Sequence, residues 1–243
     1  ATGATTCLVA QIGYHAAGIG AVAQIPAPLG YYVATTGATT AIAALPGYYV
    51  GVTAAATSTA CAIGGFSAST AQSACTPAPP GSYVASVAAT TPTACIAGSY
   101  TSTTGASACT PAPAGSFIDA IGATGPTPCA GGRYTAVEGA TACQVAIPGY
   151  YAPGPGATAQ LPSPLGQFVA ASGANQPTPA PSGRYVGVTA ATASSACTIG
   201  TYSGNTGASA CTPAPAGSFV NTSAATAQSG LERIRNEPVP IHY

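Results

Sequence analysis

The stretch CTPAPAGSF occupies residues 109–117 and returns unchanged at residues 211–219, and its near copy CTPAPPGSY covers residues 75–83. Each copy holds a glycine followed two residues later by an aromatic residue, and this signature recurs every 17 residues without insertion or deletion. We call its thirteen glycines the marker glycines: Gly13, Gly30, Gly47, Gly64, Gly81, Gly98, Gly115, Gly132, Gly149, Gly166, Gly183, Gly200 and Gly217. Free loops tolerate changes of length. A period without any such change therefore predicts repeats that stack on their neighbours in fixed register.

An aromatic residue stands two positions after every marker glycine except the first. These residues are Tyr32, Tyr49, Phe66, Tyr83, Tyr100, Phe117, Tyr134, Tyr151, Phe168, Tyr185, Tyr202 and Phe219. The first repeat has His15 there, which we interpret as one more stacked ring rather than a base or a ligand. Repeat proteins fill one inward position per repeat with the same large residue. We therefore expect an aromatic column inside a narrow core of small residues.

Eight of the nine cysteines fall at two positions of the repeat, three residues before one marker glycine and six residues before the next. Pairing across either 14 or 20 residues is compatible with this spacing. Both positions lack cysteine together at Ser163 and Pro177, and again at Ala27 and Ala41, so only the 14-residue pairing strands no cysteine. It predicts four disulfides between neighbouring repeats: Cys61–Cys75, Cys95–Cys109, Cys129–Cys143 and Cys197–Cys211.

Zinc is the rival interpretation of these cysteines. Zinc sites favour short C-x2-4-C spacing and often include histidine, and neither feature is present. Disulfides instead predict an oxidising setting, so we expect a secreted, extracellular or cell-surface protein. Cys7 lies at the second of the two positions and its partner position would precede residue 1, so we expect it to be free or paired with another chain.

Glycine and proline interrupt every run that could form a helix, which predicts an all-β fold. We expect an elongated repeat array, a β-solenoid of thirteen 17-residue turns, with a stack of disulfide-linked β-hairpins as the alternative. Proline cannot donate to a strand ladder, so we expect the Pro-x-Pro segments to be polyproline-like rather than strand. The expected boundaries are an N-terminal extension over residues 1–6, the array over 7–227 and a tail over 228–243.

The segment GSYTSTTGASACTPAPAGSF at residues 98–117 resembles the extracellular ephrin-receptor-like cysteine-rich repeat. That family's pattern is roughly C-x-x-C-P-x-G-x-[YF] followed by a Gly-Ala-x-x-Cys segment, and Ala112 stands where the family has its second cysteine. The chain is also similar to the Ala- and Thr-rich repeats of secreted bacterial surface proteins. The resemblance covers about residues 7–227, implies an extracellular setting and carries no activity.

The composition excludes several classes of function. Four Lys+Arg balance four Asp+Glu, and only 3% of residues are charged, so nothing indicates nucleic acid or anionic lipid as a partner. Apolar stretches are too interrupted for a membrane span, and we expect any secretion signal to have been removed before Ala1. Asp119, Glu138, Arg133 and Arg184 are scattered, and no pair of carboxylates suggests acid–base chemistry. We expect no enzyme, no metal and no cofactor.

These observations favour a structural subunit of a secreted filament, sheath or surface layer that assembles end to end with copies of itself. An ice-binding solenoid and a carbohydrate-binding adhesin are the alternatives, based on a Thr/Ser column and on the YY pairs at 31–32, 48–49 and 150–151. Hydroxyl-rich faces could carry O-linked sugars, and NTS at 221–223 is an N-glycosylation acceptor. The candidate acceptors are Asn221, Thr39, Thr90, Thr124, Thr141, Thr158, Thr192 and Thr226.

The tail differs from the repeats because it holds four of the eight charged residues and alternates apolar side chains. We expect it either to cap the array or to dock on a neighbouring subunit. The residues expected to make that contact are Leu231, Ile234, Val239, Ile241 and Tyr243.

Overall fold

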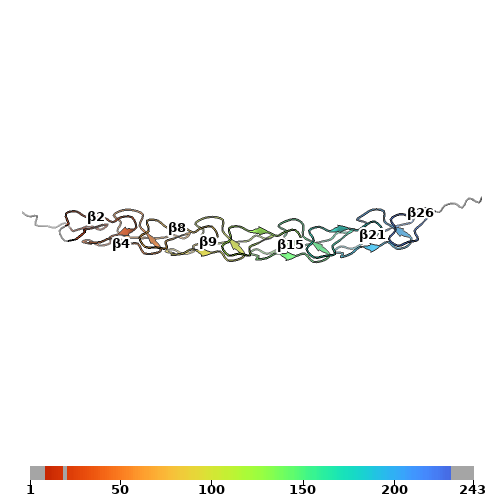
Figure 1. The fold of residues 1–243 in the computed structure, drawn as a ribbon, viewed down its shortest axis with the longest axis horizontal. Helices are drawn as coiled ribbons and strands as arrows, with labels where there is room; N and C mark the ends of the chain where they lie inside the picture. The colour runs from red at the N-terminus through yellow and green to blue at the C-terminus, as the bar shows by residue number, and fades with distance from the viewer. Residues whose placement is uncertain (1–8, 19–20, 231–243) are drawn as a thin grey trace, which may run out of the picture. The chain divides into compact units, whose positions relative to one another are not determined.

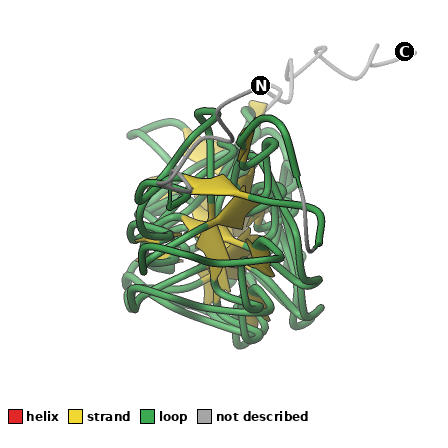
Figure 2. Ribbon diagram, turned by 90° about the vertical axis from the view of Figure 1, so that its left-hand side faces the viewer, coloured by secondary structure: helices red, strands yellow, loops and turns green. Residues whose placement is uncertain are grey.

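The computed structural model of the protein describes residues 9–18 and 21–230, which form two-residue β-strands joined by turns and contain no helix (Figures 1 and 2). Cys7 and the contact residues expected in the tail lie outside the described residues. The expected all-β class is confirmed. Each strand pairs with the next one along the chain, so every sheet has two strands.

The strands form thirteen hairpins, one per repeat. Their bounds are β1 (Tyr14–His15) with β2 (Ile25–Pro26), β3 (Tyr31–Tyr32) with β4 (Ile42–Ala43), β5 (Tyr48–Tyr49) with β6 (Thr59–Ala60), β7 (Gly65–Phe66) with β8 (Thr76–Pro77), β9 (Ser82–Tyr83) with β10 (Thr93–Ala94), β11 (Ser99–Tyr100) with β12 (Thr110–Pro111), β13 (Ser116–Phe117) with β14 (Thr127–Pro128), β15 (Arg133–Tyr134) with β16 (Gln144–Val145), β17 (Tyr150–Tyr151) with β18 (Leu161–Pro162), β19 (Gln167–Phe168) with β20 (Thr178–Pro179), β21 (Arg184–Tyr185) with β22 (Ser195–Ala196), β23 (Thr201–Tyr202) with β24 (Thr212–Pro213), and β25 (Ser218–Phe219) with β26 (Ser229–Gly230).

The pairing is antiparallel in each hairpin, for example Tyr31 opposite Ala43 and Tyr32 opposite Ile42. It is the pairing of the hairpin alternative, and the described residues form no sheet that runs from one repeat into the next. The last strand, Ser229–Gly230, lies beyond residue 227, so the array extends further than its predicted end.

Each marker glycine forms the third residue of a β-turn that leads into its hairpin. The N–H of Tyr31, for instance, donates to the C=O of Pro28 at 3.0 Å. The marker glycines have φ between +79° and +87°, which is the conformation that a type II turn requires at this position and that glycine adopts most readily. The turn therefore explains why this residue is glycine in all thirteen repeats.

Proline occupies strand positions, contrary to our expectation that the Pro-x-Pro segments lie outside strands. Pro77 is the second residue of β8 and stands opposite Gly65. The next residue, Ala78, donates its N–H to the C=O of Gly64 at 2.8 Å. Hydrogen-bonded and non-hydrogen-bonded pairs alternate along an antiparallel ladder, so Pro77 falls at a pair that needs no N–H. The missing donor therefore breaks no bond.

Hydrogen bonds from hairpin to hairpin repeat with the same period within each compact unit. In the first repeats, Gly30 N–H donates to Val50 C=O at 2.9 Å, Val33 N–H to Ala55 C=O at 2.9 Å, and Ala54 N–H to Ala27 C=O at 2.8 Å. An inserted or deleted residue would shift all three bonds at once. The strict 17-residue period follows from this register.

The core consists mainly of two columns of small or β-branched residues, joined in some repeats by a buried alanine eight residues after the marker glycine, such as Ala55 and Ala191. One column lies three residues before the marker glycines and includes Ala27, Cys61 and Ser163, each with an exposed fraction of 0%. The other lies three residues after them and includes Val33 and Val50. The aromatic residues are half-buried apart from exposed Phe219, so they flank this core and do not fill it as we expected. A Val or Ala core leaves no room for a ring between backbones this close.

The described residues divide into two compact units, which the sequence did not predict. One contains the chain up to Pro113 together with Phe117–Thr127 and Glu138–Ala142. The other contains Ala114–Ser116, Pro128–Val137 and the chain from Cys143 onward. Both are built from the same hairpins and bonds.

Candidate functional site

Four disulfides join neighbouring hairpins. They are Cys61–Cys75, Cys95–Cys109, Cys129–Cys143 and Cys197–Cys211, with Cα–Cα distances of 5.7 to 5.8 Å. The pairing is the 14-residue one. Cys61 directly follows β6 and Cys75 directly precedes β8, so the bridge ties the second strands of two successive hairpins. Disulfides of this number are typical of proteins outside the reducing cytosol.

Hairpins without a disulfide use other bonds at the same place. Gln24 and Gln160 occupy the position of the second cysteine, and their Oε1 atoms accept from the backbone N–H of Gln11 and Ile147 at 3.0 Å. In hairpin β21–β22 the guanidinium of Arg184 donates to the hydroxyl of Ser194 at 2.8 Å and to its carbonyl. The second-cysteine position therefore carries a disulfide or a side-chain hydrogen bond in several hairpins, whereas Ala41, Pro92, Pro126 and Pro177 occupy it in others.

Among the described residues, the acidic side chains and Arg133 are scattered. Asp119, Glu138 and Arg133 are exposed and lie in separate loops and strands. His15 is half-buried in the aromatic column, and its Nδ1 has no hydrogen-bond partner among the described atoms. Within residues 9–18 and 21–230 no group of three His, Cys, Asp or Glu side chains is placed to hold a metal ion.

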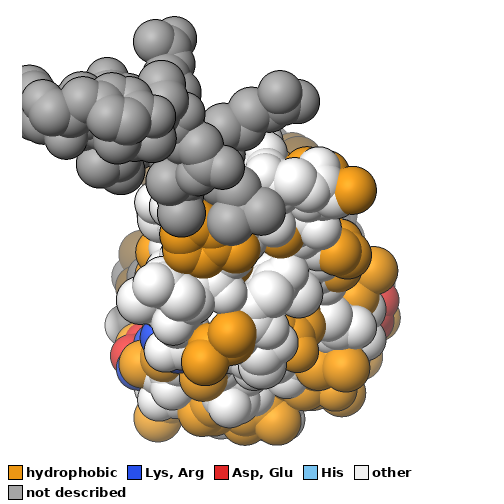
Figure 3. All heavy atoms as spheres, turned by 90° about the vertical axis from the view of Figure 1, so that its right-hand side faces the viewer, with side chains coloured by type: hydrophobic (Ala, Val, Ile, Leu, Met, Phe, Trp, Pro, Cys, Tyr) orange, Lys and Arg blue, Asp and Glu red, His pale blue; other side chains and the backbone are white. Residues whose placement is uncertain are grey.

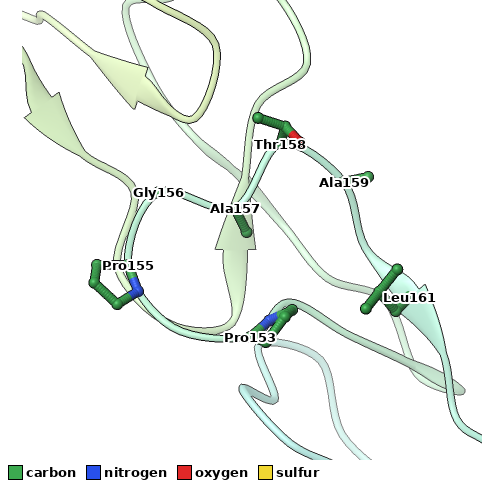
Figure 4. Close-up of a pocket in the computed structure, with 7 residues that line it drawn as sticks. All are labelled: Pro153, Pro155, Gly156, Ala157, Thr158, Ala159 and Leu161. Carbon is green, nitrogen blue, oxygen red and sulfur yellow. The ribbon is translucent and has the colours of Figure 1, made fainter.

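The cavities are shallow and carry little chemistry. One, of about 300 Å³, lies in the loop from Pro153 to Leu161, where Thr158 supplies the one polar side chain of the lining (Figure 4). A second, of about 550 Å³, lies beside the Cys61–Cys75 bridge and is lined by Tyr49, Thr59 and Ile63 among others. Neither lining contains a charged side chain, so neither has the convergent polar groups of a typical ligand site.

The candidate glycosylation sites all lie on the surface. Asn221 and the seven threonines are exposed. The threonines stand nine residues after a marker glycine, where other repeats have serine or, in three cases, Val22, Ala56 and Asn175. The column therefore presents hydroxyl groups to solvent but is not uniform. The tyrosines of the three YY pairs are half-buried.

Many large aliphatic side chains outside the core column of Val33 and Val50 are exposed. Ile12, Leu29, Ile63, Leu165 and Ile199 directly precede marker glycines at turn tips and are 49% to 69% exposed. On the face drawn in Figure 3, hydrophobic side chains lie among white atoms of other side chains and of the backbone, and few charged side chains are visible. A surface with so few charges favours contact with other molecules over colloidal stability.

The position seven residues after each marker glycine is always Gly or Ala, and sequence reasoning did not derive the backbone conformation that explains this restriction. Ala54, Ala71, Ala88, Ala190 and Ala224 have φ between +54° and +59° there, and the described glycines at this position are also left-handed. The C=O of this residue lies against the marker glycine two hairpins earlier, as Ala71 does against Gly30. The restriction to the two smallest residues was the available signal.

Comparison with protein-family models and with curated protein sequences found no match. None of the described residues forms a helix of the length and apolar character that a membrane span needs.

Proposed function

We propose that the protein is a secreted structural subunit that assembles with copies of itself into an extracellular filament, sheath or surface layer. The observation that carries this proposal is the bonding between hairpins. Three backbone hydrogen bonds of the same kind recur every 17 residues and join each hairpin to the hairpins that follow it. Each hairpin therefore contacts its neighbours through the same surface. A hairpin surface that binds another hairpin within the chain is also suited to bind a hairpin of a second copy. Stacking of the hairpins into a solenoid-like column belongs to the same proposal.

The rest of the molecule supports a structural role. The core consists mostly of small side chains, and the four disulfides tie successive hairpins. A charge content of 3% leaves little electrostatic repulsion between copies.

The oxidised full-length chain is expected to form filaments as its concentration is raised. Negative-stain electron microscopy and sedimentation velocity on the same samples would measure this. Filaments whose mass increases with concentration are the expected result. A folded chain that stays monomeric over the whole concentration range would contradict the proposed function.

Glycosylation is part of the proposal, because exposed threonines recur along an array that has almost no charges to keep it soluble. The protein purified from its native source is expected to be heavier than the unmodified chain, with sugars on Thr39, Thr90 and their equivalents. Intact-mass and peptide mass spectrometry would test this, and Asn221→Gln separates the N-linked acceptor from the O-linked ones. A native chain of unmodified mass would rule the sugars out.

A further inference from the structure

We infer that two copies join head to tail through one defined surface, in which the last described hairpin of one copy, β25–β26, is covered by the first described hairpin, β1–β2, of a second copy. This inference rests on the proposed function and specifies its contact. The joint would repeat between chains the interface that already connects successive hairpins within the chain.

The surface next to β25–β26 is open where equivalent surfaces are closed. Gly200, Gly217 and Phe219 are exposed, whereas the other eleven marker glycines are buried and the other residues of the aromatic column are half-buried. Ala214 is half-buried, although its equivalents Ala27 and Ala180 are completely buried. In the rest of the array the following one or two hairpins cover these positions. We call these four residues the trailing face.

Backbone groups on the trailing face also lack partners among the described residues. The N–H groups of Gly217 and Val220 have none, whereas their equivalents Gly183 and Val186 donate to the carbonyls of Ser203 and Ala208 at 2.8 and 2.9 Å. Backbone polar groups are nearly always paired when they are buried. Two carbonyl groups placed like those of Ser203 and Ala208 would accept from these two N–H groups.

The first described hairpin carries that pair of carbonyls. Ala16 and Ala21 stand three and eight residues after Gly13. The C=O of Ala16 accepts from the N–H of Gly18 at 2.8 Å and keeps a second lone pair, and no described residue donates to the C=O of Ala21. Ala16 is half-buried and Ala21 exposed, whereas the equivalent Val33 and Ala55 are buried. We call Ala16 and Ala21 the leading face. Following the internal bonds, Gly217 N–H would donate to Ala16 C=O of the second copy, and Val220 N–H to its Ala21 C=O.

The repeat phase of the two faces also agrees. Gly13 of the first described hairpin and Gly217 of the last are both marker glycines, so the two faces are built from the same positions of the 17-residue repeat. None of the residues that define the two faces is charged.

The test places a charge on the leading face of the full-length oxidised chain. Ala21 is exposed in the single copy, so Ala21→Lys should leave the unfolding midpoint unchanged. In the joint the lysine would lie at a position that is half-buried in most repeats and 8% to 9% exposed at Ala55, Ala140 and Ala191. We expect Ala21→Lys to abolish filaments. Ala85→Lys, at an exposed alanine within the array, is the matched control and should assemble like the wild type. Ala191→Lys should lower the unfolding midpoint, which verifies that the buried position rejects lysine.

A mixing experiment tests the head-to-tail order. The Ala21→Lys chain keeps its trailing face, so a small fraction of it added to the wild-type chain should end growing filaments and shorten them. Ala85→Lys added in the same proportion should not. Filaments of Ala21→Lys like those of the wild type would overturn the joint while leaving the proposed function standing. A wild-type chain that forms no filaments would overturn both.

Discussion

Gly81→Ala is expected to destabilise the protein more than the same change at another marker glycine, Gly200. Gly81 has φ +79°, and an added Cβ would collide with the backbone carbonyl of Gly122 two hairpins further on. The left-handed conformation costs an alanine about 1–2 kcal/mol, and forcing an atom into a filled site costs about 1–3 kcal/mol more. The flexible end of a side chain could move away, but Gly122 presents backbone, which cannot shift without moving its hairpin. We therefore expect the free energy of unfolding to fall by about 2–5 kcal/mol.

Gly200 provides a matched control because it has φ +87°, yet no described atom lies within 4 Å of its added Cβ. Gly200→Ala should show the conformational cost alone, about 1–2 kcal/mol. Urea unfolding of both oxidised variants, monitored by circular dichroism, measures the difference between their free energies of unfolding, provided that the dependence on urea concentration is unchanged. Equal shifts for the two variants would mean that the approach of hairpins two repeats apart contributes nothing to stability.

The period, the class of secondary structure and the cysteine pairing could be derived from the sequence because each follows from spacing alone. A disulfide at a fixed phase requires a fixed register, and the joint loss of both cysteine positions at Ser163 and Pro177 leaves one pairing. Helix was excluded by the density of Gly and Pro. These inferences needed no knowledge of which side chains point inward.

The identity of the core could not be derived, because size and hydrophobicity suggest the wrong residues. Tyr83 is larger than Val84 and recurs more strictly, yet Val84 is 3% exposed and Tyr83 is half-buried. The backbones of neighbouring hairpins are joined directly by hydrogen bonds, as from Val84 N–H to Ala106 C=O at 3.0 Å. Backbones that lie this close accept only small side chains between them, so the aromatic rings lie at the edge of the core.

The strand prolines were misjudged for a related reason. Whether proline is tolerated depends on which pairs of the ladder are hydrogen-bonded, and that depends on where the ladder begins. The bond from Ala78 N–H to Gly64 C=O sets this alternation. A sequence pattern shows Pro77 but not this bond.

Removing one disulfide is expected to be the other large loss of stability. Cys61→Ser combined with Cys75→Ser should lower the free energy of unfolding by about 3 kcal/mol, since the bridge closes a loop of about 15 residues. Serine suits the buried position, because Ser163 occupies its equivalent with 0% exposure and donates its Oγ hydrogen to the C=O of Ala191 at 3.3 Å. The double substitution therefore removes the cross-link without leaving a cavity or an incompatible polar group. Loss of less than about 1 kcal/mol would show that the hairpin bonds alone hold this region.

The reverse change tests the same cross-link by gain. Ala44, directly after β4, and Ser58, directly before β6, occupy the two cysteine positions of two successive hairpins that no disulfide joins, and Ala44 is completely buried like Cys61. Because the four native bridges span nearly the same Cα–Cα distance, Ala44→Cys with Ser58→Cys should form a fifth and raise the free energy of unfolding by about 3 kcal/mol. Denaturant unfolding and mass measurement of the free thiols would follow it. If the bridge causes the gain, the added stability disappears when the native and engineered proteins are compared in reducing agent. A gain that persists in reducing agent would mean that the new side chains stabilise the protein by packing.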